Sequence, residues 1–110
     1  MQRDRCATLT IEAAPMISPF NSVYSHGFIR ASVCIPRLRV ADPVFNAERT
    51  LAMAERASAE GAALAVFPEL GLSAYSNEDL FQQDALQEAT LAALETVVQS
   101  SANWTPIVLV

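Results

Sequence analysis

Two strand patterns separated by a helix pattern lie near the middle of this chain, and they restrict its fold more than any other feature. Alternating residues, rich in β-branched and small apolar side chains, predict a first strand from about Phe28 to Ile35, which ends at Pro36. An unbroken apolar run at 62–67 predicts a second strand that is covered on both faces, and Pro68 ends it. Two strands joined by a helix form a parallel pair with a right-handed crossover. The chain is therefore predicted to be an α/β protein.

The helix between these strands has sequence signals at both ends. Asp42 and Pro43 form the pair expected of an N-cap followed by proline at the first helical position. Gly61 is the residue type expected just past the last helical turn. The spacing therefore predicts a helix that begins at Pro43 and ends at Gly61, with one apolar stripe against the sheet. That stripe consists of Val44, Ala47, Leu51 and Ala54.

A second helix and a third strand are predicted in the last third of the chain. The segment 76–79 (SNED) supplies a cap and an acidic first turn, and the helix is expected from about Asp84 to Ser100. The run from Pro106 to Val110 then predicts another buried strand. The expected apolar face of the helix consists of Leu86, Ala89, Ala93, Leu94 and Val97.

The two ends of the sequence lead to an expectation about domain organisation. No turn, cap or polar segment follows the last strand pattern, so residues 22–110 are expected to be the truncated N-terminal part of a longer domain. Pro15 and Pro19 interrupt a segment that has no sustained period. Residues 1–21 are therefore expected to be a leader or a poorly ordered arm.

Composition excludes several classes of function. The net charge is −5 and the arginines are scattered, so no basic face is available for a nucleic acid. All seven basic residues are arginine, which means that this chain alone cannot supply a catalytic amine. Cys6, Cys34 and His26 lack the spacing of a metal site or a disulfide framework. No apolar run approaches the roughly 18 residues of a membrane helix, and no signal peptide is recognisable, so a cytoplasmic protein is expected.

The strongest candidate for chemistry is the segment from Phe67 to Ser76, which directly follows the second predicted strand. Glu69 stands at the carboxyl end of that strand, where α/β proteins place their sites. A carboxylate that is partly desolvated there is suited to act as a general base. Strand ends commonly carry charges, however, and a capping or solvated loop glutamate is the alternative.

Three segments carry a resemblance to a known family. The pattern FPEL-x-L-x-x-Y at 67–75 closely resembles the first catalytic motif of the nitrilase (carbon-nitrogen hydrolase) superfamily. The stretches 24–31 (YSHGFIRA) and 75–86 (YSNEDLFQQDAL) are similar to the glutaminase domains of bacterial glutamine-dependent NAD synthetases. The resemblance covers about Ser22 to Val110 and implies that the domain at 22–110 is part of an αββα sandwich.

The resemblance also implies a Glu-Lys-Cys triad that hydrolyses the side-chain amide of glutamine. Glu69 matches the glutamate that accepts the proton of the cysteine thiol, while the lysine stabilises the tetrahedral intermediate. Tyr75 matches a position that shapes the glutamine pocket or the tunnel entrance, with a place in the core as the alternative. Because no lysine is present, the triad lysine and cysteine are expected beyond Val110, and these 110 residues alone are expected to be inactive.

The resemblance also implies a second domain, its cofactors and an oligomeric state for the complete enzyme. Ammonia would pass through a tunnel to a C-terminal synthetase domain that uses ATP and Mg²⁺, while the glutaminase step needs no cofactor and no metal. A homo-oligomer is implied for the complete enzyme. Cys34 is expected in the core, Cys6 receives no role, and His26 is expected to be structural or at the surface. The alternatives are another amidase or nitrilase, and a truncated non-catalytic product that acts only by association.

Overall fold

The protein forms a four-stranded sheet in which three strands are parallel. The computed structural model describes residues 5–10 and 20–110, and all statements about structure refer to these residues. The strands are β1 (Arg5–Thr10), β2 (Arg30–Ile35), β3 (Leu64–Val66) and β4 (Ile107–Leu109), in the order β1-β2-β3-β4. β1 pairs with β2 antiparallel, whereas β2, β3 and β4 pair parallel to one another. The predicted α/β class is confirmed.

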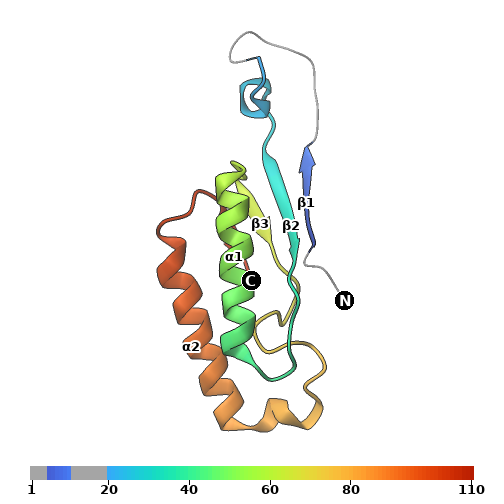
Figure 1. Cartoon of the computed structure of the whole chain (residues 1–110), viewed down its shortest axis with the longest axis vertical. Helices are drawn as coiled ribbons and strands as arrows, with labels where there is room; N and C mark the ends of the chain where they lie inside the picture. The colour runs from blue at the N-terminus through green and yellow to red at the C-terminus, as the bar shows by residue number, and fades with distance from the viewer. Residues whose placement is uncertain (1–4, 11–19) are drawn as a thin grey trace.

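Two helices form the connections between the parallel strands. The helices are α1 (Pro43–Ala59) and α2 (Asp84–Ser101), with short 3-10 helices η1 (Val23–His26) and η2 (Glu78–Gln82). Figure 1 shows α1 and α2 side by side and running in the same direction. This is the arrangement expected when strand, helix and strand alternate in one parallel sheet. No helix of the described part of the chain is both long enough and apolar enough to cross a membrane.

Both ends of α1 form as the sequence predicts. The Asp42 side chain accepts a hydrogen bond from the Phe45 amide at 3.1 Å, and Pro43 occupies the first helical position. Gly61 follows the last turn with a φ of 74°, in the left-handed region that glycine adopts at low cost. Local capping chemistry therefore determines where this helix begins and ends.

The buried face of α1 differs from the predicted stripe. Val44, expected to be buried, is 68% exposed, and Leu51 is only partly buried. Ala47 and Ala54 are buried as expected, but the rest of the face includes Pro43, Asn46, Thr50, Met53 and Ala57. The prediction followed the apolar residues alone, and it missed the two polar side chains that are buried, those of Asn46 and Thr50. The true face is rotated by about one residue along the helix.

The core between α1 and the sheet is built largely from small side chains. Ala54, Ala57, Ala62 and Ala65 are fully buried, and they pack with Cys34, Met53 and Phe67. Alanines on both surfaces let the helix approach the strands closely. A second cluster joins α1 to α2 through Ala47, Leu72, Ala93 and Val97, and Trp104 packs against both clusters. Leu94, predicted on the buried face of α2, is 37% exposed.

Several expectations about strands need correction. β4 was expected to be buried, but Ile107 is 70% and Leu109 is 51% exposed, because β4 pairs only with β3 in the described sheet and no described element covers its outer face. On β3, Ala65 is fully buried on the helix side, while Leu64 and Val66 on the other face are only partly covered. β1 lies within the segment for which no element was predicted; residues 1–4 and 11–19 of that segment lie outside the described residues.

The carboxyl end of α1 is bound by two side chains, those of Tyr24 in η1 and of Arg30 at the start of β2. The Tyr24 hydroxyl donates to the Gly61 carbonyl oxygen, and the Arg30 guanidinium donates to the Glu60 carbonyl oxygen. The last carbonyl groups of a helix lack partners within the helix and carry partial negative charge. A cation and a hydroxyl at this position therefore stabilise the helix end and fix it against β2.

Replacing Arg30 with alanine is expected to loosen the last turn of α1, because Glu60 then loses a charged donor. We expect a loss of about 1 to 2 kcal/mol in local stability. Hydrogen exchange should show faster exchange at the amides of 56–61, with Tyr24→Phe giving a smaller effect. The amides of α2 serve as the internal control, and unchanged exchange at 56–61 would contradict this role of Arg30.

Candidate active site

Glu69 lies just outside the carboxyl edge of the central parallel strand. β3 stands between β2 and β4, and the Phe67 amide extends its pairing by donating to the Leu109 carbonyl oxygen at 2.9 Å. Phe67, the residue that follows β3, is buried, and Pro68 then turns the chain out of the sheet. Glu69 therefore occupies the edge at which parallel sheets place their functional groups.

A tight turn, Pro68 to Gly71, presents the Glu69 side chain. The Gly71 amide donates to the Pro68 carbonyl oxygen at 3.2 Å, and Leu70 has a φ of 55°. A large residue in the left-handed region costs of order 1 kcal/mol or more, so surrounding contacts must hold the turn. A Cβ on Gly71 would lie 3.1 Å from the Pro68 oxygen, which explains why glycine fits this position.

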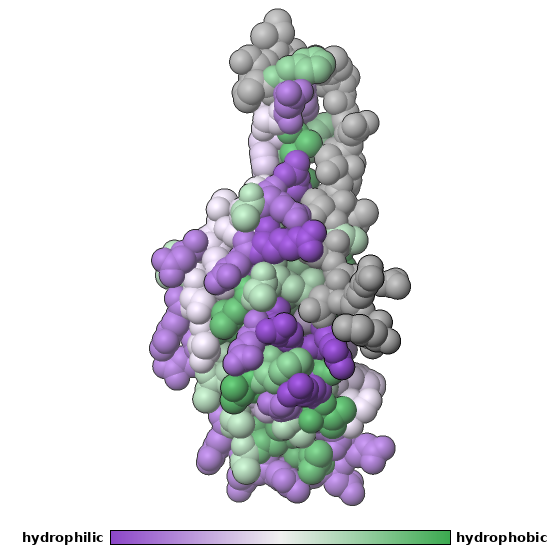
Figure 2. Space-filling view, viewed as in Figure 1, coloured by the Kyte–Doolittle hydropathy of each residue, from purple (hydrophilic) through white to green (hydrophobic). Residues whose placement is uncertain are grey.

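Glu69 is exposed, so the expected partial desolvation of its carboxylate is wrong for this chain. The reason is geometric: the residue stands in the turn, beyond the last covered residue of β3. Tyr75 is 73% exposed and is not part of the described core, in contrast to the alternative considered for it. Hydrophobic residues gather at the surface where α1 begins (Figure 2), and Val40 and Val44, on either side of its first residue, are exposed.

Asn46, which the sequence reasoning did not single out, joins the start of α1 to the Glu69 segment. Its side chain is fully buried. The amide nitrogen donates to the Arg39 carbonyl oxygen at 2.8 Å and to the Leu72 carbonyl oxygen at 2.9 Å. Its oxygen accepts from the Arg39 amide at 2.7 Å. Asn46 thus uses both of its donors and one acceptor across two separate loops.

A second set of hydrogen bonds joins the same two loops. The Ala41 amide donates both to the Ser73 carbonyl oxygen and to the Asn77 side-chain oxygen, each at 3.0 Å. Asn77 is 2% exposed, and its amide nitrogen donates to the Ala74 carbonyl oxygen. Ala41 and Ala74 have φ values of 53° and 67°, respectively. The carbonyl groups of residues 72–74 are therefore held in place one after another.

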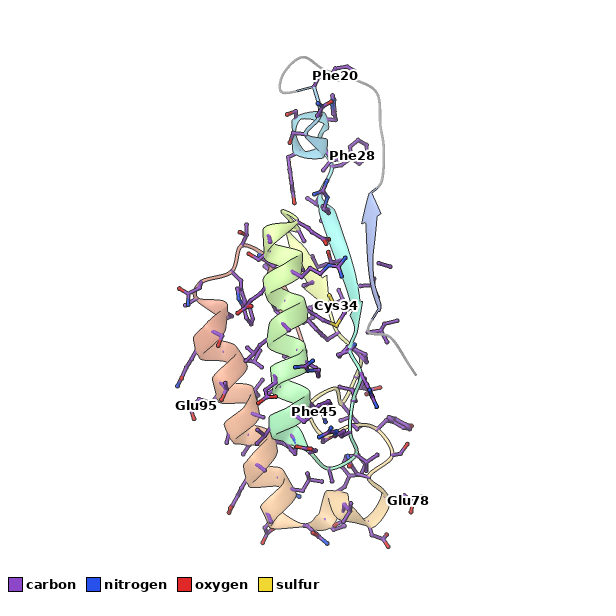
Figure 3. The ribbon with its side chains drawn as sticks, viewed as in Figure 1. Phe20, Phe28, Cys34, Phe45, Glu78 and Glu95 are labelled. Carbon is purple, nitrogen blue, oxygen red and sulfur yellow. The ribbon has the colours of Figure 1, made fainter. Side chains whose placement is uncertain are left out.

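The remaining candidates do not join Glu69. Cys34 is fully buried on β2, and Figure 3 shows it among the packed side chains beneath α1. The side chain of Cys6 lies outside the described residues. His26 lies in η1, where its ring nitrogen is 3.3 Å from the Phe20 carbonyl oxygen. Within residues 5–10 and 20–110, no group of three or more His, Cys, Asp or Glu side chains could hold a metal ion.

An open groove of about 320 Å³ lies on the α2 side of the Glu69 loop. Its lining consists of Leu70, Ser73, Phe81, Leu86, Gln87, Thr90 and Leu91. The Gln87 side-chain nitrogen already donates to the Phe81 carbonyl oxygen at 2.9 Å. Since no lining residue is charged, the groove alone cannot form ion pairs with both the ammonium and the carboxylate of a free amino acid.

Comparison with known proteins shows which family this chain resembles. The family model for carbon-nitrogen hydrolases matches residues 30–110. The glutamine-dependent NAD(+) synthetases of Mycobacterium bovis and Mycobacterium tuberculosis are 46% identical to this chain over 91 residues, and that of Mycobacterium leprae is 40% identical. The match covers 83% of this chain and 13% of each relative. The chain therefore spans about an eighth of the length of these relatives.

Proposed function

Because this chain belongs to the carbon-nitrogen hydrolase family, we propose that it is the part of a glutaminase domain that supplies the general base. The complete protein, the product of the whole reading frame containing these residues, would be a glutamine-dependent NAD synthetase, as its mycobacterial relatives are named. The observation that carries the proposal is Glu69, held in a constrained turn at the carboxyl edge of β3. A family match at residues 30–110 includes this segment.

In the proposed reaction Glu69 accepts the proton of a cysteine thiol, and the thiolate attacks the amide carbon of glutamine. A lysine stabilises the negative charge on the tetrahedral oxygen. Ammonia leaves with the proton that Glu69 returns, and a glutamyl thioester remains. Water then attacks this thioester, and Glu69 accepts a proton of the water and passes it to the departing cysteine sulfur, which releases glutamate and restores the free thiol and the Glu69 carboxylate. The lysine and the cysteine would come from residues that follow Val110.

In the complete protein, we propose that two domains carry out two successive reactions. Ammonia would pass to a C-terminal synthetase domain, which uses ATP and Mg²⁺ to amidate nicotinic acid adenine dinucleotide. The hydrolysis of glutamine needs no cofactor. Tyr75, exposed and six residues after Glu69, would contribute to the glutamine pocket or the tunnel entrance. The complete enzyme is proposed to be a cytoplasmic homo-oligomer with no nucleic acid or membrane partner.

One observation is compatible with the alternative of a non-catalytic product that acts only by association. The sheet face opposite the helices exposes Val33, Ile35, Ile107 and Leu109. These residues share that face because Val33 pairs in register with Val66, which pairs with Leu109. The downstream sequence distinguishes the alternatives: a lysine in a PK-x-x-L-P segment and a cysteine before an acidic residue support a glutaminase. An amidase or nitrilase would lack the Ser-Gly-Gly-x-Asp-Ser loop of the synthetase domain.

The 110 residues alone are expected to release no ammonia from glutamine. A general base without its nucleophile cannot form the thioester, and the described cysteine, Cys34, is fully buried in the core. Ammonia release should be compared between the 110-residue chain and its Glu69→Ala variant. Release by the first that exceeds release by the second would contradict the proposal, because the reaction would then need neither the later lysine nor the later cysteine.

A further inference from the structure

Asn46 stands on the buried face of α1, where apolar side chains are the rule. Asparagine is a poor helix former, and burying an amide is unfavourable unless its hydrogen bonds are satisfied. Asn46 satisfies both donors, through Arg39 and Leu72. The bonds to Arg39 lie within the local loop, whereas the bond to Leu72 crosses 26 positions in sequence. That second bond connects the helix to the loop of Glu69.

The loop that Asn46 binds, residues 70–74, also contains strained backbone conformations. Leu70 and Ala74 both have positive φ values without being glycine, and Ala41 on the opposite loop does too. Such conformations persist only where the surroundings impose them. The Leu72 carbonyl group lies between Leu70 and Ala74 and is bound by Asn46. Releasing it would let the Pro68 to Gly71 turn relax toward ordinary backbone angles and would move Glu69.

The local environment fixes the other end of this connection. The Arg39 guanidinium lies 3.8 Å from the centre of the Phe45 ring and 3.6 Å from the Asp42 carboxylate. The Arg39 backbone is bound on both sides by the Asn46 amide. The Asn46 side chain therefore extends from the first turn of α1, and the loop before that turn is held by these contacts. Figure 3 shows Phe45 at this end of α1, close to the loop that follows β3.

We infer that Asn46 is a positioning residue for Glu69: it binds the Leu72 carbonyl group and so holds the turn that presents the general base. This inference rests on the proposed function and adds a residue to it. Because its side chain is fully buried, Asn46 would act through the turn and not by contact with the substrate. Its loss should therefore lower the rate of the glutaminase reaction more than the binding of glutamine, because a displacement of about 1 Å can cost about 10²-fold in rate.

The test uses the complete protein and measures NAD formation with either glutamine or ammonium chloride as the nitrogen source. For Asn46→Ala we expect glutamine-driven kcat to fall by roughly 10- to 100-fold, with the KM for glutamine changed by less than about threefold. The ammonia-driven rate should be unchanged. The matched control is Thr50→Ala: Thr50 is buried one turn later on the same face, and its hydroxyl has no hydrogen-bond partner within the described structure.

If Asn46→Ala prevents folding, Asn46→Ser is the second variant. A hydroxyl has a single donor, so serine cannot bind both the Arg39 and the Leu72 carbonyl groups. Equal loss of the glutamine-driven and ammonia-driven rates, or the same loss in Thr50→Ala, would overturn the inference. Full glutamine-driven activity in Asn46→Ala would overturn it while leaving Glu69 as the base. If Glu69→Gln also retained that activity, the proposed function itself would fail.

Discussion

Replacing Glu69 with glutamine in the complete protein is expected to lower glutamine-driven NAD formation by about 10²- to 10⁴-fold, the usual contribution of a general base. Glutamine has nearly the same size and shape as glutamate, but its amide cannot accept the thiol proton at neutral pH. The turn itself uses backbone groups, the Gly71 amide and the Pro68 carbonyl oxygen, and should survive the substitution. Ammonia-driven NAD formation bypasses this step and should proceed at the original rate.

The comparison of nitrogen sources separates catalysis from folding. Glu95→Gln provides the matched control, since Glu95 is an exposed glutamate on α2 that points away from α1 (Figure 3). Its carboxylate accepts a hydrogen bond from the Gln99 side chain, 3.2 Å away on the same exposed face. We expect this control to retain both activities. A Glu69→Gln protein that loses ammonia-driven synthesis to the same degree would point to structural damage and would count against Glu69 as the base.

The parts of the fold that follow from short-range chemistry were predicted well. The cap at Asp42, the proline at the first helical position and the glycine at 61 locate α1 to within about two residues, because each acts on its immediate neighbours. The start of α2 at Asp84 also agrees with the prediction, but the segment 76–79 does not cap this helix: Glu78 and Asp79 lie in η2, and Gln83, which precedes α2, makes no side-chain capping hydrogen bond. The parallel pairing of β2 with β3 followed from the crossover alone.

Burial was predicted less well, because it depends on which elements are neighbours. A strand such as β4 has the same apolar sequence whether a further element covers it or not, and its exposure follows from its place in the described sheet. The small size of Ala54, Ala57 and Ala65 lets α1 approach the sheet closely, but only the structure shows that these three residues belong to one buried cluster. Amphipathic patterns identify a helix more reliably than they identify its buried face.

The same contrast between local signals and long-range contacts applies to the residues of the candidate site. Glu69 was proposed from its position after an apolar strand and from the FPEL resemblance, both of which are local features. Asn46 and Asn77 were missed because their roles are set by carbonyl groups in other loops. Asn46 lies outside the predicted stripe of Val44, Ala47, Leu51 and Ala54, so the helical periodicity carried no signal for its burial. Its role became visible only when the structure placed its side chain against the Leu72 carbonyl group.

Phe67→Ala is expected to have the largest effect on stability, at about 3 to 5 kcal/mol. Phe67 is the largest fully apolar side chain of the cluster between α1 and the sheet, and it is 7% exposed. The neighbouring side chains are mostly alanines, which cannot extend to fill the space that a ring leaves. The cavity should therefore remain largely open, and its cost adds to the lost transfer free energy.

Phe20→Ala is the matched control, because it removes the same atoms from a residue that is 75% exposed at the far end of the molecule from α2 (Figure 3). Its effect should stay within about 0.5 kcal/mol. Urea unfolding of the complete protein, followed through the transition of the domain that contains these residues, measures both. Similar losses for the two variants would mean that Phe67 is no more important to packing than a surface ring. In that case the core could not be what fixes the carboxyl end of β3, from which the Glu69 turn begins.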